Sequence, residues 1–105
     1  MKQYEIYLVN LEPTVGSEIK KTRPCVIISP DEMNQGLRTV QIAPMTTTTK
    51  KYPWRVSTVF KRKKGAIALD QIRTIDKQRL VKKAGSLKAD SIKQIKSILY
   101  EMLIQ

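Results

Sequence analysis

Residues 5–75 consist of short runs of β-branched, aromatic and other apolar residues, and a proline, a glycine or a charged turn closes each run. Such runs predict β-strands joined by hairpin-like connections. The predicted strands span residues 5–11, 25–29, 37–44, 54–60 and 66–69, residues 70–75 continue extended, and residues 31–36 have room for one helical turn. Strands this short and closely spaced favour a small β-barrel. Residues 46–53 and 61–64 are then loops, and Gly65 turns the chain into the fifth strand.

The pattern of the last quarter changes from strand to helix. Apolar residues recur there at intervals of three and four, at Ile92, Ile95, Ile98, Met102 and Leu103. This spacing predicts one amphipathic helix. Asp90 and Ser91 offer capping chemistry near its start, which places the N-terminus at residues 88–90. We expect the apolar stripe to cover the open side of the barrel, with a dimer contact or a membrane-surface role as the alternatives.

Length and charge bound the number of domains and the kind of partner. A chain of 105 residues with 41% apolar residues predicts one folded domain, residues 1–105. Twenty Lys and Arg against nine Asp and Glu leave a net charge of +11, which attracts RNA, DNA or an acidic protein segment. Residues 61–105 hold twelve of the basic residues and four acidic ones, so we expect the second half to build most of the surface that faces a polyanion.

Two residue types restrict the chemistry. The single cysteine, Cys25, lies in an apolar run, which predicts a buried and unreactive thiol. The chain has no histidine, and this removes the commonest general base and the commonest metal ligand. Because no acidic cluster has metal-ligand spacing either, we expect no metal and no other cofactor. The sequence shows no signal-like apolar segment and no apolar run of membrane-spanning length, which predicts a cytoplasmic protein that does not bind a membrane.

Residues 11–29 place a charged, glycine-containing loop directly before an apolar strand. Pro13 ends the first strand, and Gly16 lets the backbone turn sharply. A strand that begins at Pro24 holds Arg23 extended, so that its guanidinium projects from a rigid rim and suits a phosphate. The alternative is that glycine and proline only shape a solvated hairpin loop.

RNA can be cleaved by its own 2′-hydroxyl, and the chain carries candidates for each group that this reaction needs. Arg23 can place a fork of N–H donors on the phosphate oxygens. Thr46 can donate a hydrogen bond without titrating. Glu18 or Asp70 can accept the proton if burial or neighbouring groups make it a stronger base. For either carboxylate, an ion pair with a neighbouring Lys or Arg is the alternative.

Tyr52 and Trp54 stand among basic residues, which predicts a platform on which an unpaired base can stack. A buried tryptophan that plugs the end of the barrel is an equal alternative. The basic residues at 61–64 and 77–83 can bind a phosphate backbone or simply remain solvated. Further candidates for RNA contact are Ser17, Lys20, Lys21, Thr47, Thr48, Gln71 and Arg73.

Three blocks occur in order along the chain: EPTVGSE followed by RP and an apolar strand, then PMTTTTKKYPW, then GAIALDQIRTID. In this order and spacing they resemble the MazF/PemK toxins of bacterial toxin–antitoxin pairs, over nearly the whole chain. The resemblance implies a mainly β fold with a C-terminal helix, an SH3-like small barrel of the MazF/PemK/CcdB kind. It also implies a homodimer that cleaves single-stranded mRNA at short motifs without a metal, leaving a 2′,3′-cyclic phosphate and a 5′-hydroxyl. An acidic antitoxin would neutralise it.

By the same resemblance, Arg23 and Thr46 occupy the family's catalytic arginine and threonine positions. Glu18 matches an acidic position implicated in some members, and Asp70 matches the position of the base in PemK-like members. PemK-like members have a histidine where this chain has Ser17, so Arg23 and Thr46 rank above the two carboxylates. Two other functions remain as alternatives: a non-catalytic RNA-binding barrel, and a gyrase-directed toxin of the CcdB type, which lacks the Arg and Thr pair.

Overall fold

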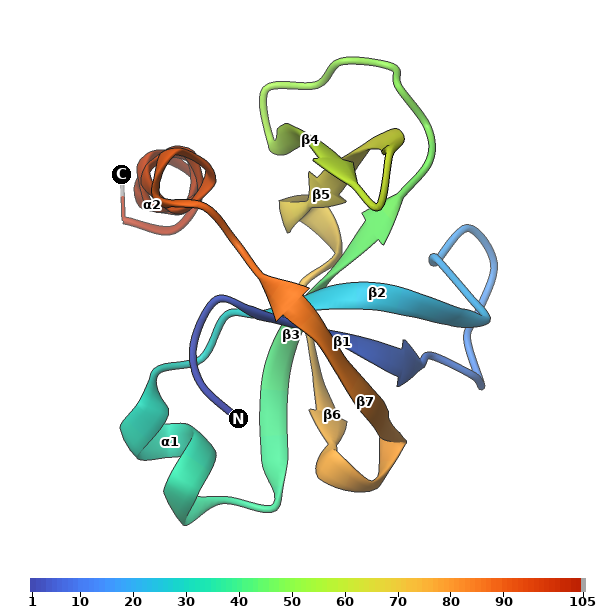
Figure 1. The fold of residues 1–105 in the computed structure, drawn as a ribbon, viewed down its shortest axis with the longest axis vertical. Coiled ribbons are helices and arrows are strands. Elements are labelled where there is room, and N and C mark those ends of the chain that lie inside the picture. The colour runs from blue at the N-terminus through green and yellow to red at the C-terminus, as the bar shows by residue number, and fades with distance from the viewer. Residues whose placement is uncertain (105) are drawn as a thin grey trace.

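The computed structural model describes residues 1–104 and shows a strongly curled antiparallel sheet with one long helix packed against it (Figure 1). The strands are β1 (Glu5–Asn10), β2 (Thr22–Ile27), β3 (Thr39–Thr46), β4 (Arg55–Phe60), β5 (Lys63–Ala68), β6 (Arg73–Asp76) and β7 (Leu80–Ser86). The helices are α1 (Asp31–Gly36) and α2 (Ala89–Leu103), and 3-10 turns occupy Leu69–Gln71 and Lys77–Arg79. The predicted mainly β fold with a C-terminal helix is confirmed.

The order of the strands explains why the sheet curls into a half-barrel. The strands run β4-β5-β3-β2-β1-β7, and β6 pairs separately with β3. One edge of β3 is shared, because residues 39–42 pair with β6 whereas Met45 and Thr46 pair with β5. The two partners leave β3 in different directions, so the β4–β5 hairpin stands apart from the strands around β1 and β2 (Figure 1). Thr46 is the last residue of β3 and lies in the part that pairs with β5.

Both faces of the central strands are buried, which explains the unbroken apolar run at residues 25–28. Alternate residues of the run belong to two separate hydrophobic cores. The first core includes Val26, Ile28, Met45, Val56 and Ile67, and the second includes Cys25, Ile27, Val40 and Ile42. The helix α2 covers the first core through the fully buried Ile95, as the apolar stripe predicts. The end of that stripe is not covered, since Met102 and Leu103 are exposed.

Two strand boundaries and one turn near the predicted site differ from the prediction. Strand β2 begins at Thr22, so Pro24 lies inside the strand and does not start it. Strand β3 extends to Thr46, which makes this threonine a strand residue, because its backbone pairs with β5. Asp70 is not extended but belongs to the 3-10 turn that separates β5 from β6. Sequence periodicity does not report such tertiary pairing, and the ends of elements are accordingly its weakest prediction.

The tip of the β4–β5 hairpin is shorter than predicted. Lys63 already belongs to β5, so only Lys61 and Arg62 form the turn. Both turn residues have positive φ angles, 49° and 68°, as a tight two-residue hairpin turn requires. Such a turn normally selects glycine or asparagine, and the basic residues here therefore hide the turn signal in the sequence.

Strand β7 is absent from the prediction because its sequence, LVKKAGS, lacks a clean alternation. It pairs antiparallel with β1, and two register shifts interrupt this pairing. The shifts leave Val81 and Ala84 without partners in β1, and Val81, Lys82 and Lys83 are all exposed. The run at residues 77–83 is therefore partly a strand and not only a solvated charged segment.

The helix α2 begins where the sequence predicts, but its start is not capped as expected. Lys88 is the N-cap residue, and its side chain makes no capping hydrogen bond. The Asp90 carboxylate instead accepts a hydrogen bond from Gln94 Nε2 at 3.3 Å. Within residues 1–104, neither helix has the length and the apolar composition needed to cross a membrane.

Candidate active site

Arg23 and Thr46 meet on neighbouring strands. Cys25 of β2 pairs with Pro44 of β3, and the same register continued by two residues sets Arg23 opposite Thr46. Residues opposite each other in an antiparallel pair share one face, and both side chains line one cavity of about 320 Å³. Apolar walls and a basic rim complete this cavity, with lining residues that include Leu8, Phe60, Lys61, Lys63 and Lys64.

The half-buried Arg23 side chain is oriented by the loop that precedes it. Its Nε donates a hydrogen bond to the carbonyl oxygen of Lys20 at 3.3 Å. Across residues 1–104, no hydrogen bond or ion pair occupies its two terminal nitrogens. The end of the guanidinium is therefore free to bind two oxygens of a phosphate at once.

The hydroxyl of Thr46 is arranged as a donor. Its Oγ1 accepts a hydrogen bond from the backbone N–H of Thr48 at 3.2 Å, which fixes the oxygen at the end of β3. A threonine hydroxyl has one hydrogen and two lone pairs, so this bond leaves the hydrogen available. Arg23 and Thr46 thus offer N–H and O–H donors to the same cavity.

Gly65 is a positioning residue, although the sequence predicts it to be the turn before the fifth strand. It lies inside β5 and is not the turn before it. A Cβ built on Gly65 would lie 2.2 Å from the carbonyl oxygen of Thr46, far closer than an ordinary contact of 3.4 Å or more. Only glycine allows the two strands to approach this closely, and the close approach holds the end of β3 in place. A glycine inside a strand pattern is the sequence signal that indicates such an approach.

Five other predicted site residues line a second hollow. It also has a volume of about 320 Å³, and the predicted residues that line it are Ser17, Glu18, Asp70, Gln71 and Arg73. Two of them hold the loop between β1 and β2. Gln71 Oε1 accepts the Ile19 N–H at 2.7 Å, and Arg73 Nη1 donates to the Leu11 carbonyl at 3.1 Å. The predicted residues therefore form two groups, and neither carboxylate lines the cavity of Arg23 and Thr46.

The two candidate carboxylates have different partners. Asp70 forms a two-point ion pair with Arg55, with Nε–Oδ1 at 3.0 Å and Nη2–Oδ2 at 3.1 Å. The hydrogen bond to Asp70 raises the pKa of the Arg55 guanidinium. Glu18 has no ion pair among the described residues, and its Oε1 accepts the Val15 N–H at 2.5 Å. The ion-pair alternative thus applies to Asp70 and not to Glu18.

The aromatic pair lies outside both hollows. Trp54 stacks on Tyr52 with ring centroids 5.2 Å apart and planes inclined by 18°. Trp54 is 40% exposed, so the alternative of a buried plug is wrong. Of the remaining predicted RNA contacts, Thr47 lines the Arg23 cavity, and Lys20, Lys21 and Thr48 are exposed in the loops before β2 and after β3.

Cys25 is buried in the second core, as predicted. Burial raises the pKa of its thiol to about 12, so the reactive thiolate is scarce at neutral pH. In the part of the chain that the structure describes, no three His, Cys, Asp or Glu side chains gather as metal ligands would.

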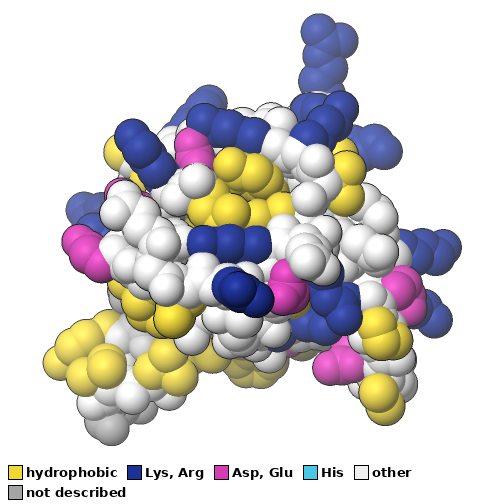
Figure 2. Space-filling model, turned by 90° about the horizontal axis from the view of Figure 1, so that it is seen from below, with side chains coloured by type: hydrophobic (Ala, Val, Ile, Leu, Met, Phe, Trp, Pro, Cys, Tyr) yellow, Lys and Arg dark blue, Asp and Glu magenta, His cyan; other side chains and the backbone are white. Residues whose placement is uncertain are grey.

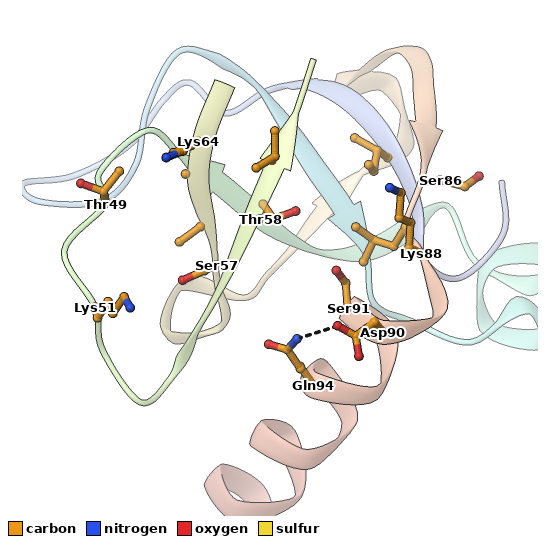
Figure 3. Close-up of a pocket in the computed structure, with 15 residues that line it drawn as sticks. Thr49, Lys51, Ser57, Thr58, Lys64, Ser86, Lys88, Asp90, Ser91 and Gln94 are labelled. Carbon is orange, nitrogen blue, oxygen red and sulfur yellow. Dashed lines mark hydrogen bonds between the residues drawn. The ribbon is translucent and has the colours of Figure 1, made fainter. Parts of the chain in front are cut away.

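A third cavity, of about 510 Å³, lies between the β4–β5 hairpin and the start of α2 (Figure 3). Figure 3 shows Ser57, Thr58 and Lys64 on the strand side, and Asp90 joined to Gln94 on the helix side. None of the predicted catalytic residues lines it, whereas Lys64 lines both this cavity and the Arg23 cavity.

Comparison with known proteins establishes the family. The family model described as "PemK-like, MazF-like toxin of type II toxin-antitoxin system" matches residues 2–103. The chain belongs to this toxin family. Endoribonuclease EndoA of Bacillus subtilis is 34% identical to this MazF/PemK chain over 105 residues, which covers 94% of the chain and 90% of EndoA.

Solved structures support the same fold at lower identity. MazF from Deinococcus radiodurans superposes with a TM-score of 0.87 at 23% identity, covering 100% of this chain and 97% of that one. A mycobacterial endoribonuclease in complex with its cognate antitoxin gives a TM-score of 0.82 at 21% identity, covering 98% and 94%. The MazF/PemK resemblance and the fold that it implies are thereby confirmed.

Proposed function

We propose that this MazF/PemK toxin cleaves single-stranded mRNA at short sequence motifs by attack of the RNA's own 2′-hydroxyl. The products would carry a 2′,3′-cyclic phosphate and a 5′-hydroxyl. As a member of the family, the chain is an endoribonuclease. The observation that carries the proposed chemistry is that Arg23 and Thr46 line one cavity and present free donors to it.

Arg23 supplies the electrostatic part of the mechanism. Negative charge accumulates on the phosphoryl oxygens as the 2′-oxygen attacks, and a guanidinium with two free terminal nitrogens can bind two of these oxygens. The lysines on the rim, Lys61, Lys63 and Lys64, add positive potential around the same point. The net charge of +11 raises the local concentration of RNA.

Thr46 supplies a neutral donor. Its hydroxyl hydrogen can bond a phosphoryl oxygen or the departing 5′-oxygen, because the Thr48 N–H already occupies a lone pair of its oxygen. The donor does not titrate near neutral pH, so its contribution is the same over the working pH range. The close approach of Gly65 keeps this group in position.

Glu18 is our candidate for the group that accepts the 2′-hydroxyl proton. The loop that carries it leads directly into Arg23, and Lys20 of that loop bonds the guanidinium. Asp70 is less suitable, because Arg55 binds both of its oxygens.

The partners follow from charge and from exposed apolar side chains. We propose that an acidic segment of a separate antitoxin binds the basic surface, as the +11 charge favours. Figure 2 shows Lys and Arg side chains spread over one face of the molecule and apolar side chains gathered at its lower left. The end of α2 exposes Tyr100, Met102, Leu103 and Ile104. This patch supports a homodimer.

The test is cleavage of one defined RNA by the purified protein in the presence of EDTA. We expect cleavage with EDTA, 2′,3′-cyclic phosphate ends by mass spectrometry, and no cleavage of DNA, which lacks the 2′-hydroxyl. Arg23→Ala should lower the single-turnover rate by roughly 10²-fold or more while RNA affinity falls much less. Cleavage that requires Mg²⁺ would overturn the mechanism. RNA binding without cleavage would favour a non-catalytic barrel, and gyrase inhibition alone would favour a CcdB-type toxin.

A further inference from the structure

A connected group of four side chains lies at the start of β4. Asp70 holds the Arg55 guanidinium at two points, 3.0 and 3.1 Å. The guanidinium in turn lies over the Tyr52 ring, 5.1 Å from its centroid, and Tyr52 stacks on Trp54. Lys50 approaches the same Tyr52 ring at 5.3 Å. The contacts therefore run from Asp70 through Arg55 and Tyr52 to Trp54, and each side chain is held by the one before it.

Trp54 is the member that is open to a ligand. Tyr52 covers one face of the indole, yet 40% of Trp54 remains exposed. An exposed indole held rigid by its neighbours binds a flat ligand with little loss of side-chain entropy. The ion pair beneath it is better sheltered, since the side chains of Arg55 and Asp70 are 14% and 30% exposed.

The group lies within reach of an RNA that occupies the Arg23 cavity. Thr46 pairs with Ala66 and Ala66 pairs with Ser57, so these side chains share one face of the β3-β5-β4 sheet. Arg55 precedes Ser57 by two residues in β4 and lies on the same face. Strand spacings of about 4.8 Å and 3.3 Å per residue put the Cα atoms of Arg55 and Thr46 roughly 12 Å apart.

We propose that Tyr52 and Trp54 form a platform on which one unpaired base of the RNA stacks beside the scissile phosphate, and that Asp70 is a positioning residue that holds this platform through Arg55. The inference rests on the proposed RNA substrate. It assigns Asp70 a role other than the proton acceptor that the family resemblance implies. The platform selects single-stranded RNA, because a base inside a duplex cannot offer its face to Trp54.

Trp54 is the only tryptophan of the chain, so its fluorescence reports on the platform alone. The probe is a single-stranded RNA whose scissile nucleotide is 2′-deoxy, which binds without being cleaved. We expect this RNA to quench the emission and a series of abasic substitutions to locate one nucleotide whose base is required. Trp54→Ala should weaken RNA binding roughly 5- to 150-fold, the range for loss of one base–aromatic stack. Val81→Ala, at an exposed apolar residue of β7, is the matched control and should leave binding unchanged.

Asp70→Asn and Arg55→Met separate the positioning role from catalysis. If Asp70 acts through Arg55, both variants should weaken RNA binding and reduce the quench similarly, and the double variant should be little worse than either. The single-turnover rate at saturating RNA should stay within about threefold of the wild type, whereas loss of a general base would cost roughly 10²- to 10⁴-fold. Arg38→Met removes an exposed arginine elsewhere and controls for the lost charge.

The outcomes distinguish this inference from the proposed function. If the uncleavable RNA quenches the fluorescence but the protein cuts no RNA, the proposed chemistry is refuted and the platform is supported. Cleavage with no quench and with full affinity in Trp54→Ala would refute the platform. A large loss of rate at saturating RNA in Asp70→Asn, with wild-type affinity and an intact response in Arg55→Met, would make Asp70 the base. Melting curves of all variants establish that each compared protein is folded.

Discussion

Replacement of Gly65 by alanine tests whether the close approach of β5 to β3 positions Thr46. The added Cβ would lie 2.2 Å from the Thr46 carbonyl oxygen, so the strands must separate by about 1.2 Å to reach an ordinary contact of 3.4 Å. A misplacement of about 1 Å at a reacting group can cost roughly 10²-fold in rate. We therefore expect Gly65→Ala to lower the single-turnover rate about 10²-fold.

The same substitution should also reduce stability, because an inserted methyl group in a packed strand pair costs about 1–3 kcal/mol. The assay must therefore combine single-turnover cleavage at saturating RNA with urea unfolding of the same preparation. The cleavage temperature should be one at which the variant is fully folded. The loss of rate is then attributable to the position of Thr46 and not to unfolded protein.

Gly36→Ala is the matched control. A Cβ at Gly36 meets no atom within 4 Å, so the variant should keep both rate and stability. Wild-type rate and stability in Gly65→Ala would refute the reasoning, since the strands would then accommodate a side chain without moving Thr46. An unstable variant that retains the wild-type rate would refute only the link between the strand approach and catalysis.

Four further expectations follow from the site. Thr46→Val should lower the single-turnover rate roughly 10²-fold while Thr46→Ser retains most of it; equal activity of the two would remove the hydroxyl from the mechanism. Arg23→Lys should restore only part of what Arg23→Ala loses, because an ammonium cannot bind two oxygens as a fork, and full activity would contradict this. Glu18→Gln should lower the single-turnover rate roughly 10²-fold or more, and an unchanged rate would exclude Glu18 as the base. At pH 8 the thiolate fraction of Cys25 is on the order of 10⁻⁴, so iodoacetamide should label the folded protein only after unfolding; rapid labelling would show an accessible thiol.

The elements that sequence alone predicts are those with a strong local pattern. The run at residues 25–28 and the three- and four-residue spacing around Ile95 both correspond to observed elements. Strand β7 has no such pattern, because two register shifts against β1 put its side chains out of phase. It forms because β1 has an edge free for backbone pairing, and the sequence of residues 80–86 holds no signal of that edge.

The candidate site shows the same division. Arg23 and Thr46 are predictable individually from their chemistry and from the family blocks. Asp70 is predictable as a candidate base, but its ion pair with Arg55 depends on how the 3-10 turn after β5 folds back towards β4. An ion pair between residues fifteen positions apart has no periodic signature, so only the structure separates a free carboxylate from a bound one.

The sequence by itself determined the class of fold, the basic charge, the buried cysteine and the identity of the residues that can bind phosphate. These follow from local periodicity and residue chemistry, which act over a few positions. Only the tertiary structure decided that Arg23 and Thr46 share a cavity while Glu18 and Asp70 line another. The reason is that strand register, the branch of β3 and the missing side chain of Gly65 set which distant residues meet, and each depends on pairing between strands far apart in the chain.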